Sequence, residues 1–183
     1  MYQGTNPSAL RSRGEIVRSF LSLLAQTDLE ELSIKQIMDA TDLSRQTFYQ
    51  IFDSKEEIIE YYLDTIFSEF ISHTKVQIVE NLCDAAKLFF SFFEAYWDTL
   101  ALFIRNGKSC MVQRKCREYL QKDQYIHYSL HGVHTEQEQE YATTFVISGM
   151  VAMLEKWVRE TPGTKVSAQE LSLLVCRITG VED

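Results

Sequence analysis

The chain has 183 residues, of which 45% are hydrophobic, and this is enough apolar material for one ordinary domain or a small module joined to a larger one. Its net charge of −8 excludes a general, charge-driven coat for nucleic acid, so any DNA contact must come from the local placement of side chains. Neither glycine nor proline occurs between Gly14 and Gly107, which disfavours hairpins and predicts an all-α fold.

The cysteines predict a reducing environment. Cys83, Cys110, Cys116 and Cys176 form no CxxC pair and show no disulfide-like regularity. The sequence opens with no charged segment followed by an apolar one, and no apolar run reaches the roughly 18–20 residues that span a bilayer. We therefore expect a cytoplasmic protein without a membrane partner.

The first three predicted helices follow one another closely along the chain. Apolar residues at helical spacing run through residues 11–26, and Ser33 stands where the N-cap of a short second helix belongs. A tight turn, with Asp42 expected in the left-handed conformation, leads to Ser44 as the N-cap of a third helix. Two short helices joined by a tight turn, with another packed across them, are typical of a helix-turn-helix domain.

A fourth helix begins at Ser54, where Glu57 three residues later completes a capping-box pattern. This helix links the first module to the rest of the chain. Further helical patterns cover residues 74–82, 84–104, 109–130, 136–159 and 168–179.

The segment LSIKQIMDATDLSRQTFYQIFDSKEEII resembles the N-terminal DNA-binding domain of the TetR family of transcriptional regulators, with a similarity that spans residues 11–60. The resemblance implies a helix-turn-helix domain over residues 1–56 and a helical effector-binding and dimerisation domain over residues 57–183. It places these residues at the DNA: Ser33, Lys35, Ser44, Arg45, Gln46, Thr47, Tyr49, Gln50 and Lys55. The sequence departs from the usual Ala-Gly before the recognition helix, since Thr41 and Asp42 stand there.

The residue types at these positions suit base recognition. Arg45 can pair bidentately with guanine, Gln46 or Gln50 with adenine, and the Thr47 methyl can touch a thymine methyl. The hydroxyls of Ser44 and Tyr49 and the ammonium of Lys55 suit phosphates, which fix register rather than sequence. The alternative is that the polar residues simply face water.

The resemblance implies a transcriptional regulator, a repressor that binds a near-palindromic DNA operator as a homodimer and is released by a small-molecule effector. An effector-independent DNA-binding protein, or a regulator controlled by a protein partner, is the alternative. No nucleophile elbow, phosphate-binding loop or carboxylate pair with a plausible water site is visible in the sequence, so we expect neither an enzyme nor a cofactor.

Aromatic residues in the C-terminal region are the candidates for the effector site, and ordinary core packing is the alternative for each one. The candidate set is Phe89, Phe93, Tyr96, Trp97, Phe103, Tyr119 and Tyr125. The dimer is expected to use two apolar stripes, one of Ala142, Phe145, Val146, Gly149, Ala152 and Met153, the other of Leu171, Leu174, Val175 and Ile178. Both stripes could instead face the protein's own core.

Two further groups of residues, three histidines and two cysteines, are candidates for a metal site and for oxidant sensing. His127, His131 and His134 lie close in sequence, but no nearby cysteine or pair of carboxylates completes a set of metal ligands, so we expect surface histidines and no metal. Cys110 and Cys116 are open to a role in sensing oxidants.

Overall fold

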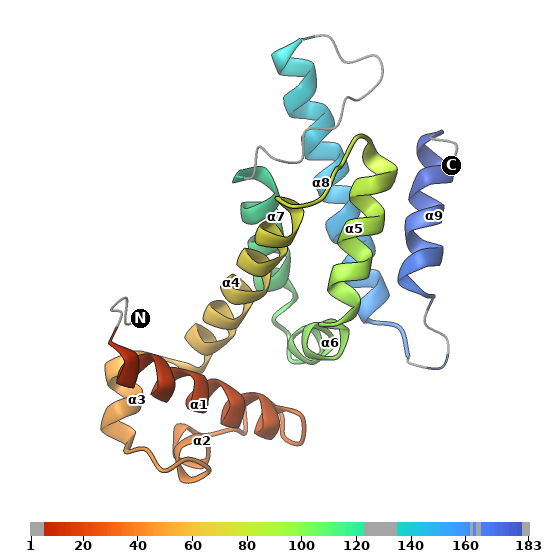
Figure 1. Cartoon of the computed structure of the whole chain (residues 1–183). Helices are drawn as coiled ribbons and strands as arrows, with labels where there is room; N and C mark the ends of the chain where they lie inside the picture. Colours follow the sequence, from red (N-terminus) through yellow and green to blue (C-terminus); the bar gives the residue numbers. More distant parts are fainter. Residues whose placement is uncertain (1–5, 123–134, 162, 164–165, 181–183) are drawn as a thin grey trace. The chain divides into compact units, whose positions relative to one another are not determined.

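The computed structural model describes residues 6–122, 135–161, 163 and 166–180. All regular secondary structure in these residues is helical, which confirms the predicted all-α class (Figure 1). The described helices are α1 (Pro7–Leu24), α2 (Ile34–Asp39), α3 (Arg45–Ile51), α4 (Lys55–Thr74), α5 (Leu82–Glu94), α6 (Trp97–Arg105), α7 (Ser109–Lys122), α8 (Glu136–Val158) and α9 (Ala168–Thr179).

The chain divides into two compact units, Met1–Asp64 and Thr65–Asp183. The boundary falls inside α4, eight residues after the end of the first domain expected from the sequence. Each unit therefore takes part of α4 into its own core.

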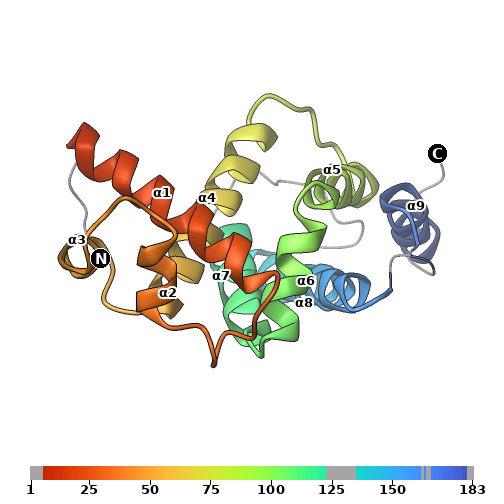
Figure 2. The same cartoon turned by 90° about the horizontal axis from the view of Figure 1, so that it is seen from below.

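The first unit is built by α1 packing against α2 and α3, as Figure 2 shows. The Ser19 hydroxyl donates to the Ile37 carbonyl at 2.7 Å and so fixes α1 on α2. The Arg13 guanidinium lies 4.9 Å from the ring centre of Tyr61, a cation–π contact between α1 and the start of α4. The fully buried apolar residues of the first unit include Ile16, Phe20, Ile37, Phe48, Phe52, Ile58, Ile59 and Leu63.

Serine caps begin the short helices at the predicted positions. The Ser33 hydroxyl accepts from the Gln36 amide at 3.2 Å, and the Ser44 hydroxyl accepts from the Thr47 amide at 3.2 Å. At the start of α4 the Ser54 hydroxyl accepts from the Glu57 amide, but the Glu57 carboxylate turns to the Asp53 amide, one residue earlier than in a standard capping box. Each cap satisfies a backbone donor that a helix N-terminus leaves unpaired.

The turn between α2 and α3 differs from the sequence prediction at Asp42. No described residue other than glycine has a positive φ, so the expectation of a left-handed Asp42 is wrong. Thr41 makes the turn instead: its hydroxyl donates to the Met38 carbonyl at 2.8 Å and accepts from the Leu43 amide at 3.2 Å. A side chain that bridges both sides of the turn removes the need for left-handed backbone.

Aromatic packing holds the second unit together. Phe70 on α4 lies within 5.2–5.7 Å, centre to centre, of Phe89, Phe92 and Phe93 on α5. Phe90, on the other side of α5, meets Trp157 of α8 edge to face at 5.9 Å. Such offset and edge-to-face pairs are favourable beyond the area that they bury.

Two predicted helices have different limits in the structure. The helix predicted over residues 74–82 does not form, since residues 75–81 are not helical. The preceding helix α4 ends at Thr74, whose hydroxyl donates to the Ile71 carbonyl. The expected helix over 84–104 is split into α5 and α6 at Ala95 and Tyr96. Neither break contains glycine or proline, so neither has a local signal in the sequence.

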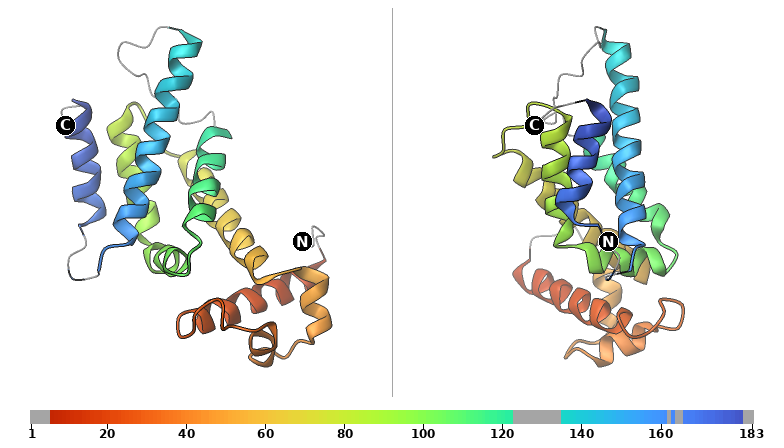
Figure 3. Two further views of the ribbon diagram at one scale, coloured as in Figure 1. Left: turned by 180° about the vertical axis from the view of Figure 1, so that it is seen from behind. Right: turned by 90° about the vertical axis from the view of Figure 1, so that its right-hand side faces the viewer.

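A disulfide joins Cys83 at the start of α5 to Cys176 near the end of α9, with 4.7 Å between the Cα atoms. The sequence analysis missed this pair because the cysteines are 93 positions apart and belong to no motif. Figure 3 shows α9 running beside α5. No described helix is both long and apolar enough to cross a membrane.

Glu155 on α8 joins that helix to α7. Its carboxylate accepts from the Ser109 hydroxyl at 2.5 Å, from the Gln113 amide group and from Arg159 at 2.7 Å. The Ser109 hydrogen bond, followed by that of Arg159, holds the pKa of Glu155 below its usual value.

We expect Glu155→Gln to lower the free energy of unfolding at pH 7 by about 1–2 kcal/mol, because a neutral amide with one acceptor oxygen replaces a charged acceptor with two. The folded pKa of Glu155 lies below the unfolded one, so its stabilisation is complete above about pH 4.3 and is lost as the pH falls through the folded pKa. Urea unfolding at several pH values measures the difference, with Glu140→Gln on the exposed side of α8 as the control. A difference that did not shrink in acid would contradict this role.

Candidate nucleic-acid interface and C-terminal cavity

The third helix separates its polar and apolar residues cleanly. Arg45, Gln46 and Gln50 are exposed, and Tyr49 exposes 59% of its surface. Phe48 and Ile51 on the opposite side are buried, at 0% and 3% exposure. The apolar side attaches α3 to its domain, and the polar side stays available for a ligand outside it.

The other residues predicted to contact phosphates lie at the N-termini of helices in the first unit. Ser33 and Lys35 are exposed at the beginning of α2, and Ser44 is exposed at the beginning of α3. Thr47 is half-buried, and its hydroxyl lies 3.0 Å from that of Ser44. This contact orients the Thr47 side chain before any DNA is bound.

Lys55 makes contacts within the chain that the sequence did not predict. Its ammonium donates to the Leu29 carbonyl at 2.5 Å and to the Leu32 carbonyl at 2.6 Å. Both carbonyls belong to the loop between α1 and α2. Lys55 therefore fixes this loop to the start of α4, while the phosphate contact stays a prediction.

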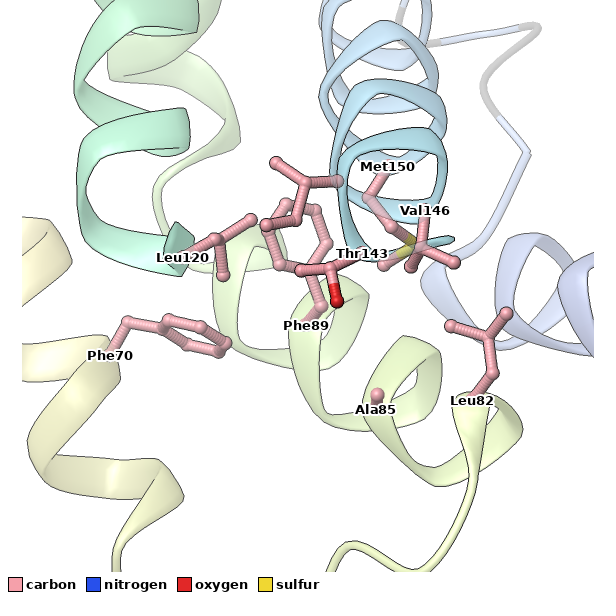
Figure 4. Close-up of a pocket in the computed structure, with 9 residues that line it drawn as sticks. Phe70, Leu82, Ala85, Phe89, Leu120, Thr143, Val146 and Met150 are labelled. Atoms are coloured by element: carbon pink, nitrogen blue, oxygen red, sulfur yellow. The ribbon is translucent and has the colours of Figure 1, made fainter. Parts of the chain in front are cut away.

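A small apolar cavity lies inside the second unit, and its volume is about 40 Å³ (Figure 4). A cavity that binds benzene has a volume of about 150 Å³, so this one is small. Residues of α4, α5, α7 and α8 form the wall: Phe70, Leu82, Ala85, Phe89, Leu120, Thr143, Val146, Ile147 and Met150. The Thr143 hydroxyl is the polar side-chain group among these residues, so the cavity suits an uncharged, apolar ligand.

Among the members of the predicted effector set that the structure describes, Phe89 alone lines this cavity. Phe93, Trp97 and Phe103 are buried elsewhere in the core, and the Trp97 ring nitrogen donates to the Trp157 carbonyl at 3.1 Å.

The two predicted tyrosines that the structure describes make polar contacts outside the cavity. The Tyr96 hydroxyl donates to Glu69 at 2.8 Å, and the Tyr119 hydroxyl lies 3.2 Å from that of Ser68. Tyr125 lies outside the described residues. The sequence could not separate core rings from lining rings, because both occur at helical spacing, and the aliphatic lining residues have no distinctive pattern.

The second unit also carries exposed apolar residues on α8 and α9. Phe145 is 81% exposed and Tyr141 is 72% exposed, and Ser148, Gly149 and Ala152 continue the same side of α8. On α9, Ile178 is 68% exposed and Leu174 is 40% exposed.

Two residues of the predicted dimer stripes, Val146 and Val175, are instead buried in the chain's own core. Ala142, Met153 and Leu171 are half-buried. The exposed stripe of α8 is thus turned slightly from the predicted one.

Among the described residues no group of three His, Cys, Asp or Glu side chains is placed to hold a metal ion, and His127, His131 and His134 lie outside that part of the chain. Cys110 is exposed and Cys116 is buried. Burial raises the pKa of the Cys116 thiol far above its usual range, although nearby Arg117 acts in the opposite direction. Cys116 therefore stays a protonated, unreactive thiol, which argues against the oxidant-sensing role considered for it.

Residues 16–62, which form most of the first unit, match the family described as bacterial regulatory proteins, tetR family. The predicted resemblance to the TetR family is confirmed over these residues. Over 57 residues the chain is also 30% identical to the HTH-type dhaKLM operon transcriptional activator DhaS of Lactococcus lactis subsp. lactis (strain IL1403). That match covers 31% of this chain and 30% of DhaS, so it compares less than a third of either protein.

Solved TetR structures share the fold over nearly the whole chain. A TetR transcriptional regulator from Streptococcus agalactiae 2603V superposes with a TM-score of 0.68 at 19% identity, covering 96% of each chain. The dihydroxyacetone kinase operon activator DhaS gives a TM-score of 0.64 at 16% identity, covering 91% of this chain and 93% of that one. A tetR-family regulator from Streptomyces coelicolor gives 0.53 at 15% identity, with 92% and 81% covered. At these identities the likeness extends to the fold alone.

The contacts of Lys55 with two carbonyls predict that its replacement lowers the stability of the first unit. We expect Lys55→Met to lower the free energy of unfolding by about 1–3 kcal/mol, because two buried or half-buried carbonyls lose a charged donor. Chemical denaturation followed by circular dichroism measures this change. Lys35→Met on the exposed start of α2 is the matched control, and equal stability of the two variants would show that Lys55 does not lock the loop.

Proposed function

We propose that this TetR protein is a cytoplasmic transcriptional regulator that binds a near-palindromic operator as a homodimer and responds to a small, uncharged, apolar effector. The observation that carries the DNA-binding part is the division of α3 into a buried apolar side and an exposed side with Arg45, Gln46, Tyr49 and Gln50. Guanidinium and amide groups are the side chains that read guanine and adenine edges in the major groove.

The homodimer is supported by the apolar residues that α8 and α9 leave exposed. In the single chain, water contacts four large apolar side chains of these helices: Tyr141, Phe145, Leu174 and Ile178. Both helices lie on the side of the second unit that faces the viewer in the right-hand view of Figure 3. The small residues Gly149 and Ala152 permit close helix approach, so a second copy can cover this surface about a two-fold axis.

The effector class follows from the cavity wall, which is apolar apart from one hydroxyl. At about 40 Å³ the cavity is too small for a ring-sized molecule unless side chains move. Met150 and Leu120 are suited to such movement, since a methionine side chain is flexible and adapts to irregular gaps. The effector would then act only through its different affinities for the two states of the protein.

Control by a protein partner is the second candidate, and the near-complete filling of the core favours it. Phe89 and Phe93 of the expected effector set pack against each other, and Phe93 also packs against Phe70, which leaves little room for a ligand between these rings. The sign of regulation is also open to test: the resemblance implies a repressor, whereas the similar protein DhaS is named an activator. Deleting the gene would raise target expression under repression and lower it under activation.

Base-specific recognition predicts an asymmetry between residues of α3. We expect Arg45→Ala to weaken binding to the operator by about 1–3 kcal/mol and to relax the base preference at one position of each half-site. The operator is first recovered by selection from random DNA duplexes, where we expect a near-palindrome, and affinities are then measured at fixed salt.

Tyr49→Phe is the matched comparison on the same helix. It removes one hydroxyl and should weaken all sequences alike, because phosphate contacts carry no base information. If Arg45→Ala kept both the affinity and the base preference of the parent protein, Arg45 would have no role in recognition.

Filling the cavity separates the two candidates for control. We expect Ala85→Leu to abolish the response to the effector in cells while operator binding persists, with Ala95→Leu at the exposed end of α5 as the control. A set of small uncharged apolar compounds, screened by thermal shift, should yield a ligand that stabilises the parent protein and not Ala85→Leu. That ligand should change operator affinity roughly 5- to 150-fold. Normal regulation by Ala85→Leu would favour the protein partner.

A further inference from the structure

Helix α9 depends on α5 for its attachment to the second unit. Its buried residues are Ala168, Ser172, Val175 and Cys176, and the helix packs chiefly along α5, antiparallel to it (Figures 1 and 3). The opposite side of α9 exposes Leu174 and Ile178. Anything that loosens the α5 contact therefore also loosens part of the proposed dimer surface.

The disulfide reinforces this contact at one end. Cys83 belongs to the first turn of α5, and Cys176 lies three residues before the last residue of α9. Both are 2% exposed, so the bond lies within the packed seam between the helices. It closes a loop whose ends are 93 positions apart, and a cross-link over so long a loop restricts the unfolded or detached chain strongly.

A disulfide is unusual in a protein that acts on DNA inside a cell, and this step rests on the proposed function. Glutathione and thioredoxin keep intracellular thiols reduced, and the disulfides that do form there are usually transient, catalytic or redox-sensing. We propose that Cys83 and Cys176 form a reversible redox site, oxidised by a low-molecular-weight disulfide such as glutathione disulfide, and that the bond controls how firmly α9 is held on α5.

Oxidation takes two exchange steps. The thiolate of one cysteine attacks glutathione disulfide, which forms a mixed disulfide and releases one glutathione thiolate. The second cysteine, as its thiolate, attacks the protein sulfur of the mixed disulfide, which forms the Cys83–Cys176 bond and releases the second glutathione. The protein gives up two protons and two electrons, and glutathione disulfide accepts them as two thiols. Reduction runs the same steps in reverse.

The burial of the two sulfurs determines when exchange takes place. Because each cysteine is 2% exposed, the reagent reaches it only while α9 is displaced from α5. Formation of the bond then traps α9 in its packed position. The oxidised protein presents Leu174 and Ile178 from a fixed helix, and the reduced protein presents them from a helix that detaches more often.

The remaining cysteines provide the controls. Cys110 is exposed and Cys116 is buried, and neither is part of the bond. In the variant carrying Cys110→Ser and Cys116→Ser, every thiol detected belongs to the pair. The full chain of this variant is equilibrated in mixtures of reduced and oxidised glutathione, alkylated and weighed by mass spectrometry.

We expect one transition, from two alkylated thiols in the most reducing mixture to none in the most oxidising one. A pair that stayed bonded in every mixture would be a permanent structural disulfide, and a pair that stayed free in every mixture would not form the bond. Either result would overturn the proposal.

Hydrogen exchange measures the consequence for α9. We expect the α9 amides to exchange at least about tenfold faster in the reduced protein, whereas the amides of the α8 core change little. Cys176→Ser should show the fast rate in both buffers. If this variant does not fold, the reduced parent protein with alkylated thiols replaces it. Equal α9 exchange in the oxidised and reduced proteins would refute control of the helix by the bond.

Sedimentation in the same two buffers connects the site to assembly. We expect reduction to raise the dimer dissociation constant several-fold, and Phe145→Asp to weaken the dimer in both redox states. Thiol counting and hydrogen exchange need no DNA, so failure to find an operator would remove the proposed function and still leave the redox site decided. Operator binding that was normal, with no redox transition, would remove the redox site alone.

Discussion

The third helix, α3, is too short to be stable by itself. A helix of seven residues in water does not repay the cost of its first turn, so α3 exists because the rest of the first unit holds it. Three contacts do this: the Ser44 cap at its start, the turn fixed by Thr41 before it, and the burial of Phe48 and Ile51. The geometry of the proposed DNA contact is thus set by the domain core and by the turn.

The second unit depends on aromatic packing where α4 and α5 meet. Phe70, Phe89 and Phe93 contact one another at 4.7–5.7 Å, which makes the unit rigid where α4 and α5 meet. The small apolar cavity lies where aliphatic side chains of α7 and α8 complete the wall. A ligand can enter this cavity only by displacing side chains of its wall. The shapes that the cavity accepts therefore depend on which of these side chains can move.

Features governed by local chemistry could be predicted from the sequence. The caps at Ser33 and Ser44 follow from a hydroxyl ahead of an apolar helical pattern, and the exposure of Arg45 and Gln50 follows from the same periodicity. Features governed by distant contacts could not. The disulfide joins cysteines 93 positions apart, and the break at Tyr96 comes without glycine or proline. The contacts of Lys55 are with two loop carbonyls that no spacing rule identifies.

The clean division of α3 has a consequence for how such a protein can diverge. Arg45, Gln46 and Gln50 are exposed, so under the proposed function substitutions there would change which bases α3 reads without removing a core contact. The residues that keep the helix folded, Phe48 and Ile51, face the other way. Duplicated copies of the gene could therefore acquire new target sequences one substitution at a time, each passing through a folded intermediate, and the same separation makes this helix a convenient place to redesign specificity.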